Sequence, residues 1–359
     1  TVLGGETLRE RPDARTYGSL LQRSPTVTAS ENRDAQTTPG RQFFSGAGGR
    51  ANEGRVEVDG LSVGPPTAGG GSSSYNADVG NAQEVTQTSA GGLGESAVGG
   101  PSINILPRTG GNAFRGTMFL ANVSEWMVAD NLSSERTDRG LPRSGDIESL
   151  WDYNLGLGGP FLRDRVWFFT NLRDQGAYRS IPGMYANKNA GDPSKRTYEA
   201  DLDRPARGAG NWRTVSLRLT SQLTPRNRLG LFWDEQTPCH GGSWAEDVEA
   251  CRRPKSDYVL GGSPGSSSPF STATVAPESS SYSGSNHLRV QQVTWTSPYS
   301  SRVLFEAGFG TYLNYWGGVE IPGNPTRDIV RVVEQCTRGC AANGGIAGLT
   351  YRSQNWANN

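Results

Sequence analysis

Four cysteines form two local pairs whose chemistry could be either disulfide bonding or metal binding. Cys239 and Cys251 lie in one polar, glycine-containing stretch, and Cys336 and Cys340 lie in another. Pairs in such loops are typical of disulfides formed in an oxidising compartment. A metal site would need His240 as well, but the chain has only 2 histidines and no Cys-x-x-Cys motif. We therefore predict structural disulfides, no metal and no other cofactor.

Three further stretches resemble catalytic or ion-binding sites, but each lacks the context that its chemistry needs. Residues 261–265 match the G-x-S-x-G nucleophile elbow, yet SSSPFS follows instead of a helix. The stretches GAGGRANEG and AGGGSSS lack the Gly-Lys-Ser/Thr of a phosphate-binding loop. The stretch ADNLSSERTD lacks the ligand spacing of an EF-hand calcium loop. Without an acid, base and nucleophile set, we predict that the protein is not an enzyme.

Two aromatic residues are candidates for contacting a ligand. Trp244 lies between the cysteines of the first pair, on a predicted long loop. Tyr75 closes the Gly/Ser-rich stretch 65–75. An exposed aromatic ring on such a loop would offer a ligand an apolar surface, although packing within the loop explains Trp244 equally well.

Charge and hydropathy exclude two broad classes of protein. The 35 basic residues balance the 35 acidic ones, so the positive surplus that nucleic-acid binding requires is absent. No run of 18 apolar residues occurs, which argues against a transmembrane helix. A transmembrane strand needs only about 9–11 residues with alternate ones apolar, so a mean hydropathy of −0.57 does not argue against strands in a membrane. The start TVLGGETL has no signal-peptide pattern, and we expect a fragment cut at both ends.

The sequence pattern changes near residue 111. Before it, glycine, serine and threonine separate short apolar groups, which predicts a small α+β domain with a helix at 16–21 and strands at 55–63, 82–89 and within 95–112. After it, apolar and polar residues alternate over about ten positions at a time. This alternation predicts seven or eight strands, near 112–122, 150–161, 166–178, 212–223, 228–236, 288–296, 302–316 and, as the eighth, 348–356.

Tight turns alternate with long loops between these strands. The turns lie at 162–165, 224–227 and 297–301, and the loops cover roughly 123–149, 179–211, 237–287 and 317–347. Short turns on one edge and long loops on the other are typical of transmembrane barrels, whereas a soluble sandwich has no reason to sort its loops by length. Around the first turn we expect Phe161, Trp167 and Phe168 in an interfacial aromatic girdle, with Asn171 and Arg173 pointing into the lumen.

Four stretches, in this order, resemble the TonB-dependent receptors of Gram-negative outer membranes, especially the Oar-like group with a carboxypeptidase-regulatory-like domain ahead of the plug. They are VDGL (58–61), EVTQTSAGGLGE (84–95), LPRTGGNAFRGTMF (106–119) and LGGPFLRDRVWFF (157–169). The resemblance implies a plug domain at 1–111 and, at 112–359, the first part of an antiparallel barrel of about 22 strands. It places the plug–barrel junction at Arg108, Gly110, Gly111 and Asn112.

The resemblance also implies a function and partners. A receptor of this family binds a scarce nutrient outside the cell and imports it with energy from the inner membrane. Its partners are TonB with its energising complex, whose contact segment has no match in this chain, outer-membrane lipid, and a small-molecule, glycan or peptide ligand. Between plug and wall we expect pairs such as Arg108 or Arg115 with wall carboxylates. The alternative is a surface or secreted adhesin or glycan-binding module, whose apolar strand faces would meet a second sheet.

Overall fold

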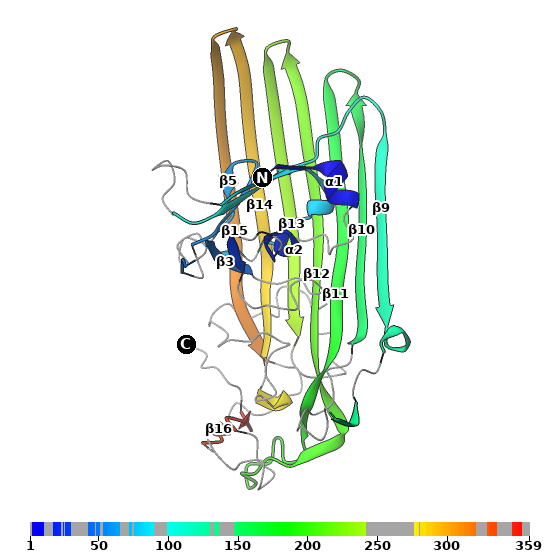
Figure 1. Cartoon of the computed structure of the whole chain (residues 1–359), viewed down its shortest axis with the longest axis vertical. Helices are drawn as coiled ribbons and strands as arrows, with labels where there is room; N and C mark the ends of the chain where they lie inside the picture. Colours follow the sequence, from blue (N-terminus) through cyan, green and yellow to red (C-terminus); the bar gives the residue numbers. More distant parts are fainter. Residues whose placement is uncertain are drawn as a thin grey trace.

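Seven long antiparallel strands form a single curved sheet, which we call the wall (Figure 1). In this computed structural model the described residues are 2–10, 17–22, 24, 26–29, 42–46, 48–50, 53–64, 72–73, 75–89, 99–129, 133–135, 147–241, 276–279, 281–320, 329–335 and 347–353. The wall strands follow one another in chain order: β9 (Arg115–Ser124), β10 (Ile147–Leu162), β11 (Val166–Asn187), β12 (Ala200–Thr224), β13 (Asn227–Gly241), β14 (Ser281–Ser300) and β15 (Val303–Glu320). Within the described residues the sheet is not closed, because β9 and β15 are its two edges.

All seven wall strands were predicted, but several are longer than their apolar alternation suggests. β11 and β12, for example, stay paired as far as Asn187 and Ala200, past register shifts near Tyr185. Backbone pairing continues there although the side-chain period has been lost, and only the period is visible in a sequence. The eighth predicted strand is wrong, because β17 (Thr350–Tyr351) pairs instead with β16 (Val332–Val333) in a separate hairpin.

The two faces of the wall have opposite character, as the alternation predicted. One face carries buried polar side chains, among them Asn154, Asn171, Arg173, Thr214, Ser216 and Arg218. The other carries exposed apolar side chains, among them Met118, Leu155, Leu172, Val215, Leu231, Val293 and Phe309. A sheet that presents a continuous apolar band to its surroundings is suited to contact with lipid.

Aromatic rings gather beside the first turn, where the girdle was predicted. The ring centroids of Phe161 and Phe168 lie 4.5 Å apart, and those of Phe114 and Phe168 lie 6.3 Å apart, next to the turn 163–165. The prediction for Trp167 is wrong, because adjacent strand residues point to opposite faces and its indole N–H donates to Asn112 Oδ1 over 2.7 Å. Trp167 therefore helps to hold the junction with the small domain.

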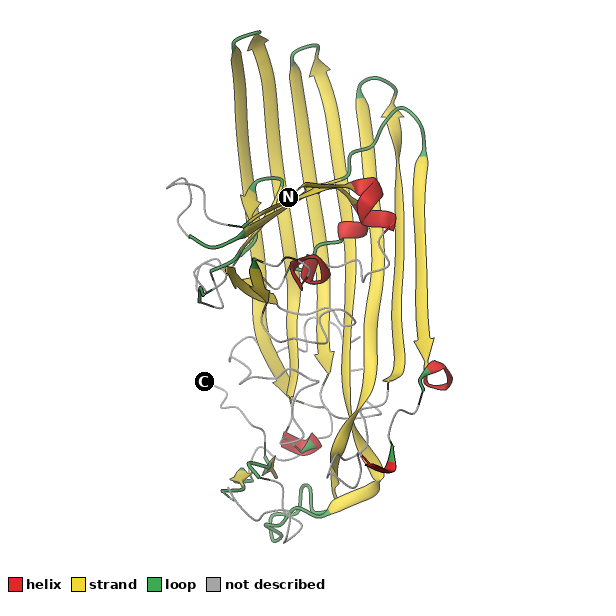
Figure 2. Ribbon diagram, in the orientation of Figure 1, coloured by secondary structure: helices red, strands yellow, loops and turns green. Residues whose placement is uncertain are grey.

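A small α+β domain lies against the polar face of the wall (Figures 1 and 2). Its main sheet has the order β1 (Val2–Gly4), β7 (Ala82–Thr88), β8 (Ser102–Pro107), β4 (Arg55–Val58) and β5 (Leu61–Ser62), and only the β4–β8 pair is parallel. The other elements are α1 (Gly5–Glu10), α2 (Tyr17–Gln22), η3 (Val79–Asn81) and a second sheet of β2 (Val27–Ala29), β3 (Gln42–Gly46) and β6 (Ser72–Ser73). The predicted helix and three predicted strands are confirmed as α2, β4, β7 and β8.

The core of the small domain is apolar and almost self-contained. Its buried members include Leu8, Leu21, Phe44, Val56, Ile103 and Ile105. Among the described residues, the wall contributes Phe232 and Val290 to the buried residues of this cluster, and Tyr312 packs against it. At the predicted Asp-Gly turn, Asp59 and Gly60 both have positive φ, which is the backbone that a tight two-residue hairpin requires. The proposed boundary at 111/112 falls between β8 and β9, and the division into two domains stays a prediction.

We expect an arginine in the middle of the apolar band to destabilise the full-length protein. Leu155→Arg should lower the free energy of unfolding in lipid vesicles, measured by urea titration, by about 2–4 kcal/mol, because the charge would sit at mid-depth in hydrocarbon. Leu223→Arg, next to the turn 225–226, is the matched control and should cost about 1 kcal/mol or less. Equal costs at both positions would contradict a lipid-facing band.

Candidate functional site

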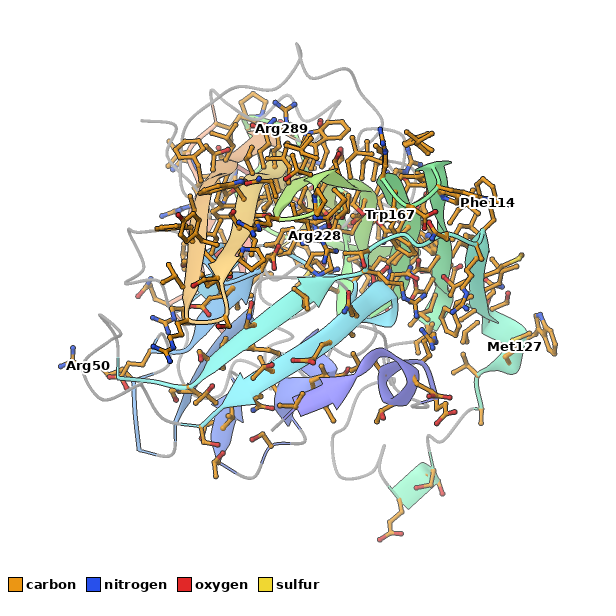
Figure 3. The ribbon with its side chains drawn as sticks, turned by 90° about the horizontal axis from the view of Figure 1, so that it is seen from above. Arg50, Phe114, Met127, Trp167, Arg228 and Arg289 are labelled. Carbon is orange, nitrogen blue, oxygen red and sulfur yellow. The ribbon has the colours of Figure 1, made fainter. Side chains whose placement is uncertain are left out.

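The surface between the small domain and the wall is the candidate site, because buried charges and amides gather there. Viewed from above, the small domain lies within the curve of the wall, and Arg289 lies on the opposite, outer side (Figure 3). Buried polar groups are costly unless they are paired, so the contacts that they make define what this surface can do.

The first contact is built around the guanidinium of Arg173, from the middle of β11. Its Nε and Nη2 donate to the two carboxylate oxygens of Asp152 on β10, over 2.8 and 2.7 Å. Its Nη1 lies 3.8 Å from Asp78 Oδ1 in the small domain. The side chain of Arg173 is 1% exposed. One buried cation thus links a wall carboxylate to a carboxylate of the small domain, the geometry in which loss of one partner is most costly.

Asp78 is held in place by the local fold of the small domain. Its Oδ1 accepts the backbone N–H of Gly80 over 3.0 Å and so caps η3, as aspartate commonly does. Its Oδ2 accepts amide hydrogens from Asn81 over 2.8 Å and from the wall residue Asn171 over 2.5 Å. Asp78 therefore receives donors from both sides of the interface.

Asn81 makes the second contact. Its Nδ2 donates to Asn154 Oδ1 on β10 over 2.7 Å, and its Oδ1 accepts from Thr117 Oγ1 on β9 over 2.7 Å. Gly156 leaves the room for this approach, since a Cβ atom there would lie 2.7 Å from Asn81 Oδ1. A single amide side chain thereby bridges two wall strands.

Two more contacts use backbone groups of the small domain. Gln236 on β13 forms a two-way pair with Asn76, accepting its N–H over 3.0 Å and donating to its C=O over 3.1 Å. On β14, Gln292 donates to the carbonyl of Val58 over 2.8 Å. An amide side chain that hydrogen-bonds to backbone N–H and C=O groups does not depend on which side chain the opposite residue carries. No sequence signal singles out these glutamines.

The tip of the Asp-Gly hairpin reaches the wall at Arg218. The Nη2 of Arg218 and the Oδ2 of Asp59 lie 2.7 Å apart. The Nε and Nη1 of Arg218 have no hydrogen-bond partner among the described residues, and neither does Oδ1 of Asp234. A cavity of about 30 Å³ lies between them, enough for a water molecule with polar partners. The interface is therefore polar and incompletely paired by protein atoms alone.

Tyr75, predicted to contact a ligand on an outer loop, is buried in the same interface. Only 3% of it is exposed, and its hydroxyl donates a hydrogen bond to Asp234 on β13. Burial, followed by the nearby charge of Asp234, raises the pKa of Tyr75 well above its usual range. The hydroxyl is thus a neutral donor at physiological pH. A role for Tyr75 in ligand binding stays a prediction.

The four residues predicted for the junction line one cavity of about 650 Å³, together with Arg9 and Arg115. Asn112 binds the first wall turn, because its Oδ1 accepts hydrogen bonds from the backbone N–H of Asp164 over 2.9 Å and from the indole N–H of Trp167. A Cβ atom at Gly110 would collide with the backbone carbonyl of Phe168. Glycine is therefore required where the chain crosses the wall strand.

The expectation that Arg108 or Arg115 pairs with wall carboxylates is wrong for the described residues. The guanidinium of Arg108 lies 5.7 Å from the ring centroid of Phe169 instead. Wall carboxylates meet arginines that belong to the wall itself, as Asp152 meets Arg173. The charges that cross the interface run from wall arginine to small-domain aspartate, opposite to the expected direction.

At the long-loop end of the wall, a second cluster packs around η7 (Pro277–Ser279). Its buried apolar members are Met184, Ala206, Ala276, Leu349 and Tyr351. Glu278 Oε1 accepts from Asn187 Nδ2 over 2.8 Å and from the backbone N–H of Arg352 over 3.3 Å. Burial raises the pKa of Glu278. Three segments far apart in sequence are thus joined around one carboxyl group.

Several predicted residues lie outside the described part of the chain. Trp244, Cys251, Cys336 and Cys340 fall there, and Cys239 is described only as backbone within β13. The disulfides and the role of Trp244 therefore stay predictions. Within the described residues, no group of three or more His, Cys, Asp or Glu side chains could hold a metal ion. The described helices include none that is long and apolar enough to cross a membrane.

Comparison with known proteins yields a sequence relative and similar folds. No protein-family model matches the chain. It is 30% identical over 156 residues to the TonB-dependent transporter Oar of Myxococcus xanthus, a match that covers 41% of this chain and 14% of Oar.

The similar folds are those of solved receptor structures. The siderophore receptor PirA of Acinetobacter baumannii is 15% identical with a TM-score of 0.51, covering 88% of this chain and 40% of PirA. A variant ferric enterobactin receptor (PfeA) of Pseudomonas aeruginosa, solved with enterobactin, is 14% identical with a TM-score of 0.52, covering 90% of this chain and 44% of the receptor. The chain thus spans less than half the length of these proteins.

We expect the buried Arg173 to stabilise the docked small domain far more than an exposed arginine of the same sheet does. Arg173→Met should lower the free energy of opening of residues 1–111, measured by proteolysis in urea, by about 3–5 kcal/mol, because Asp152 and Asp78 would lose their cation. Arg213→Met is the control, since Arg213 is half exposed in its pair with Asp174 and should contribute about 1 kcal/mol or less. Similar losses in both variants would refute a special role for Arg173.

The cluster around Glu278 should weaken as the pH rises. A carboxyl group whose pKa is raised in the folded state binds its proton more tightly there than in the unfolded state. The free energy of unfolding therefore falls as the pH rises from the ordinary pKa of about 4.3 to the raised pKa of Glu278. Hydrogen exchange of the Ala276 amide, which bonds to the Thr350 carbonyl, reports this cluster. Glu278→Gln should remove the pH dependence of its protection. Glu199→Gln, in an exposed pair with Lys188, should leave it unchanged.

Proposed function

The chain belongs to the TonB-dependent transporter family, and from this premise we propose that the protein binds a scarce nutrient outside the cell and imports it through a plugged β-barrel. TonB-dependent receptors reside in the Gram-negative outer membrane, and this is the location of the protein. In the proposal, residues 1–111 are the plug and residues 112–359 contribute the first strands of the barrel. Transport, not catalysis, is the activity of this family.

The observation that carries the proposal is the polar contact between plug and wall. The contacts of Arg173, Asn81, Gln236 and Arg218 are hydrogen bonds and ion pairs, and the plug keeps an almost separate apolar core. Water can replace hydrogen bonds of this kind one by one, whereas it cannot replace a shared apolar core without a large cost. The plug can therefore move against the wall while both keep their folds.

The energy for this movement comes from outside the chain. We propose that TonB and its inner-membrane complex pull on the plug after a ligand has bound at the long-loop end of the wall. Ligand binding there shifts the plug toward states that TonB can engage, since a ligand acts only through its different affinity for the two states. The ligand class is small-molecule, glycan or peptide.

The alternative function, an adhesin or glycan-binding module, would need a second sheet over the apolar strand faces. In the described residues those faces are exposed, with Met118 at 68% and Phe309 at 69%. Exposed apolar surface of this extent fits a protein that is surrounded by lipid. The observation favours the transporter.

Tethering the plug to the wall should abolish transport. In cells that carry the full-length gene, Asn81→Cys with Asn154→Cys, joined by a short thiol crosslinker, should stop the TonB-dependent uptake of a panel of iron chelates, cobalamin and glycans. The control joins Asn171→Cys to Ser216→Cys, two neighbouring wall residues that face the same interface, and should leave uptake intact. Uptake that persists with the plug tethered, or that needs no TonB, would overturn the proposal.

A further inference from the structure

Three arginines line the junction cavity. The described residues of its lining include Arg9, Arg108 and Arg115, and none of them is an aspartate or glutamate. None of the three arginines forms an ion pair with a described residue. Three guanidinium groups around one space repel each other, and this cost is removed when an anion lies between them.

The three arginines come from separate elements, so the fold and not a local sequence run brings them together. Arg9 lies in the last turn of α1, Arg108 directly follows β8, and Arg115 begins β9. Arg9 and Arg108 are half-buried and Arg115 is exposed. The guanidinium of Arg108 is fixed over Phe169, which orients its donors. An arginine fork that is oriented in advance loses less entropy when it binds a carboxylate or a phosphate.

Neutral donors complete the lining. Gln83 Oε1 accepts from Thr109 Oγ1 over 3.4 Å, which leaves the amide nitrogen of Gln83 as its donor toward the cavity. Glycines at 110, 111, 116 and 158 form much of the remaining lining and keep the space open. At about 650 Å³, the cavity has the size of a site for a small organic molecule.

From this arrangement we infer that the junction cavity is a binding site for a multivalent anion that carries carboxylate or phosphate groups. Donors surround the space and no described lining residue carries a carboxylate, which selects against cations and against neutral apolar molecules. The cavity lies at the tight-turn end of the wall, the end that outer-membrane barrels direct to the periplasm. The site is therefore separate from ligand capture at the long-loop end, and binding to it requires neither TonB nor transport.

The test uses the purified full-length protein, with citrate and pyrophosphate as probes. Calorimetry should show saturable binding that weakens as sodium chloride is added. The triple variant Arg9→Gln, Arg108→Gln, Arg115→Gln should bind at least about a hundredfold more weakly, since a hydrogen bond to a charged group is typically worth a factor of ten or more. The matched control neutralises three exposed arginines of the wall turns outside the cavity, Arg226, Arg228 and Arg302, and should bind as the wild type does.

A second measurement needs no variant. Phenylglyoxal modifies accessible arginines, and mass spectrometry locates the adducts. Pyrophosphate should protect Arg9, Arg108 and Arg115 but not Arg226. Nanodiscs of phosphatidylglycerol, compared with phosphatidylcholine, distinguish a lipid headgroup from a soluble anion as the source of the same chemistry. Binding that never saturates, equal loss in both triple variants, or modification that no anion prevents would overturn the inference.

Discussion

The whole arrangement depends on one constraint: the inner face of the wall is polar and must be paired. Side chains on neighbouring positions of a strand point to opposite faces, so an apolar outer band brings a polar inner surface with it. Arg173, Asn171 and Gln236 lie there largely shielded from solvent. The small domain pairs with Arg173 and Asn171 through Asp78, and with Gln236 through the backbone of Asn76. The small domain is thus the hydrogen-bonding partner that makes such an inner surface tolerable.

This constraint explains why wall and plug could be predicted to different degrees. The period of two along 212–223 fixes both the strand and its faces, and β12 agrees with it. The junction at 108–112 was found through a resemblance, and its glycine is required by the close approach to Phe168. The network of Asp78 and Asn81 was missed, because amides and carboxylates in a glycine-rich stretch look like any solvated loop. The wall partner of Asp78, Asn171, is 93 residues away in sequence, and that of Asn81, Asn154, is 73 residues away. No local sequence pattern points to either partner.

The direction of the ion pairs across the interface, from wall arginine to small-domain aspartate, was the hardest feature to predict from the sequence. A sequence shows Arg108 and Arg115 near the junction and suggests that they reach the wall. In the fold, the wall supplies the crossing cations from β11 and β12, where Arg173 is buried beside the wall carboxylate of Asp152 and Arg218 against the hairpin tip. Arg108 and Arg115 instead line the junction cavity with Arg9. The register between strands and the burial of each position decide which arginine meets which carboxylate. Both are properties of the folded sheet and cannot be seen in the sequence.

The hydrogen bonds that join Asn112 to the first wall turn have a mechanical consequence. β1 is an edge strand that pairs only with β7, in an antiparallel register, so tension on the N-terminal end would open its hydrogen bonds successively. The same tension, passed along the chain, would reach Asn112, where backbone and indole donors of the first wall hairpin converge on one amide oxygen. Beyond this residue the chain resists a pull more strongly, because β9 pairs with β10 at ten positions whereas β1 pairs with β7 at three. The small domain could yield to a pull while the wall stayed anchored.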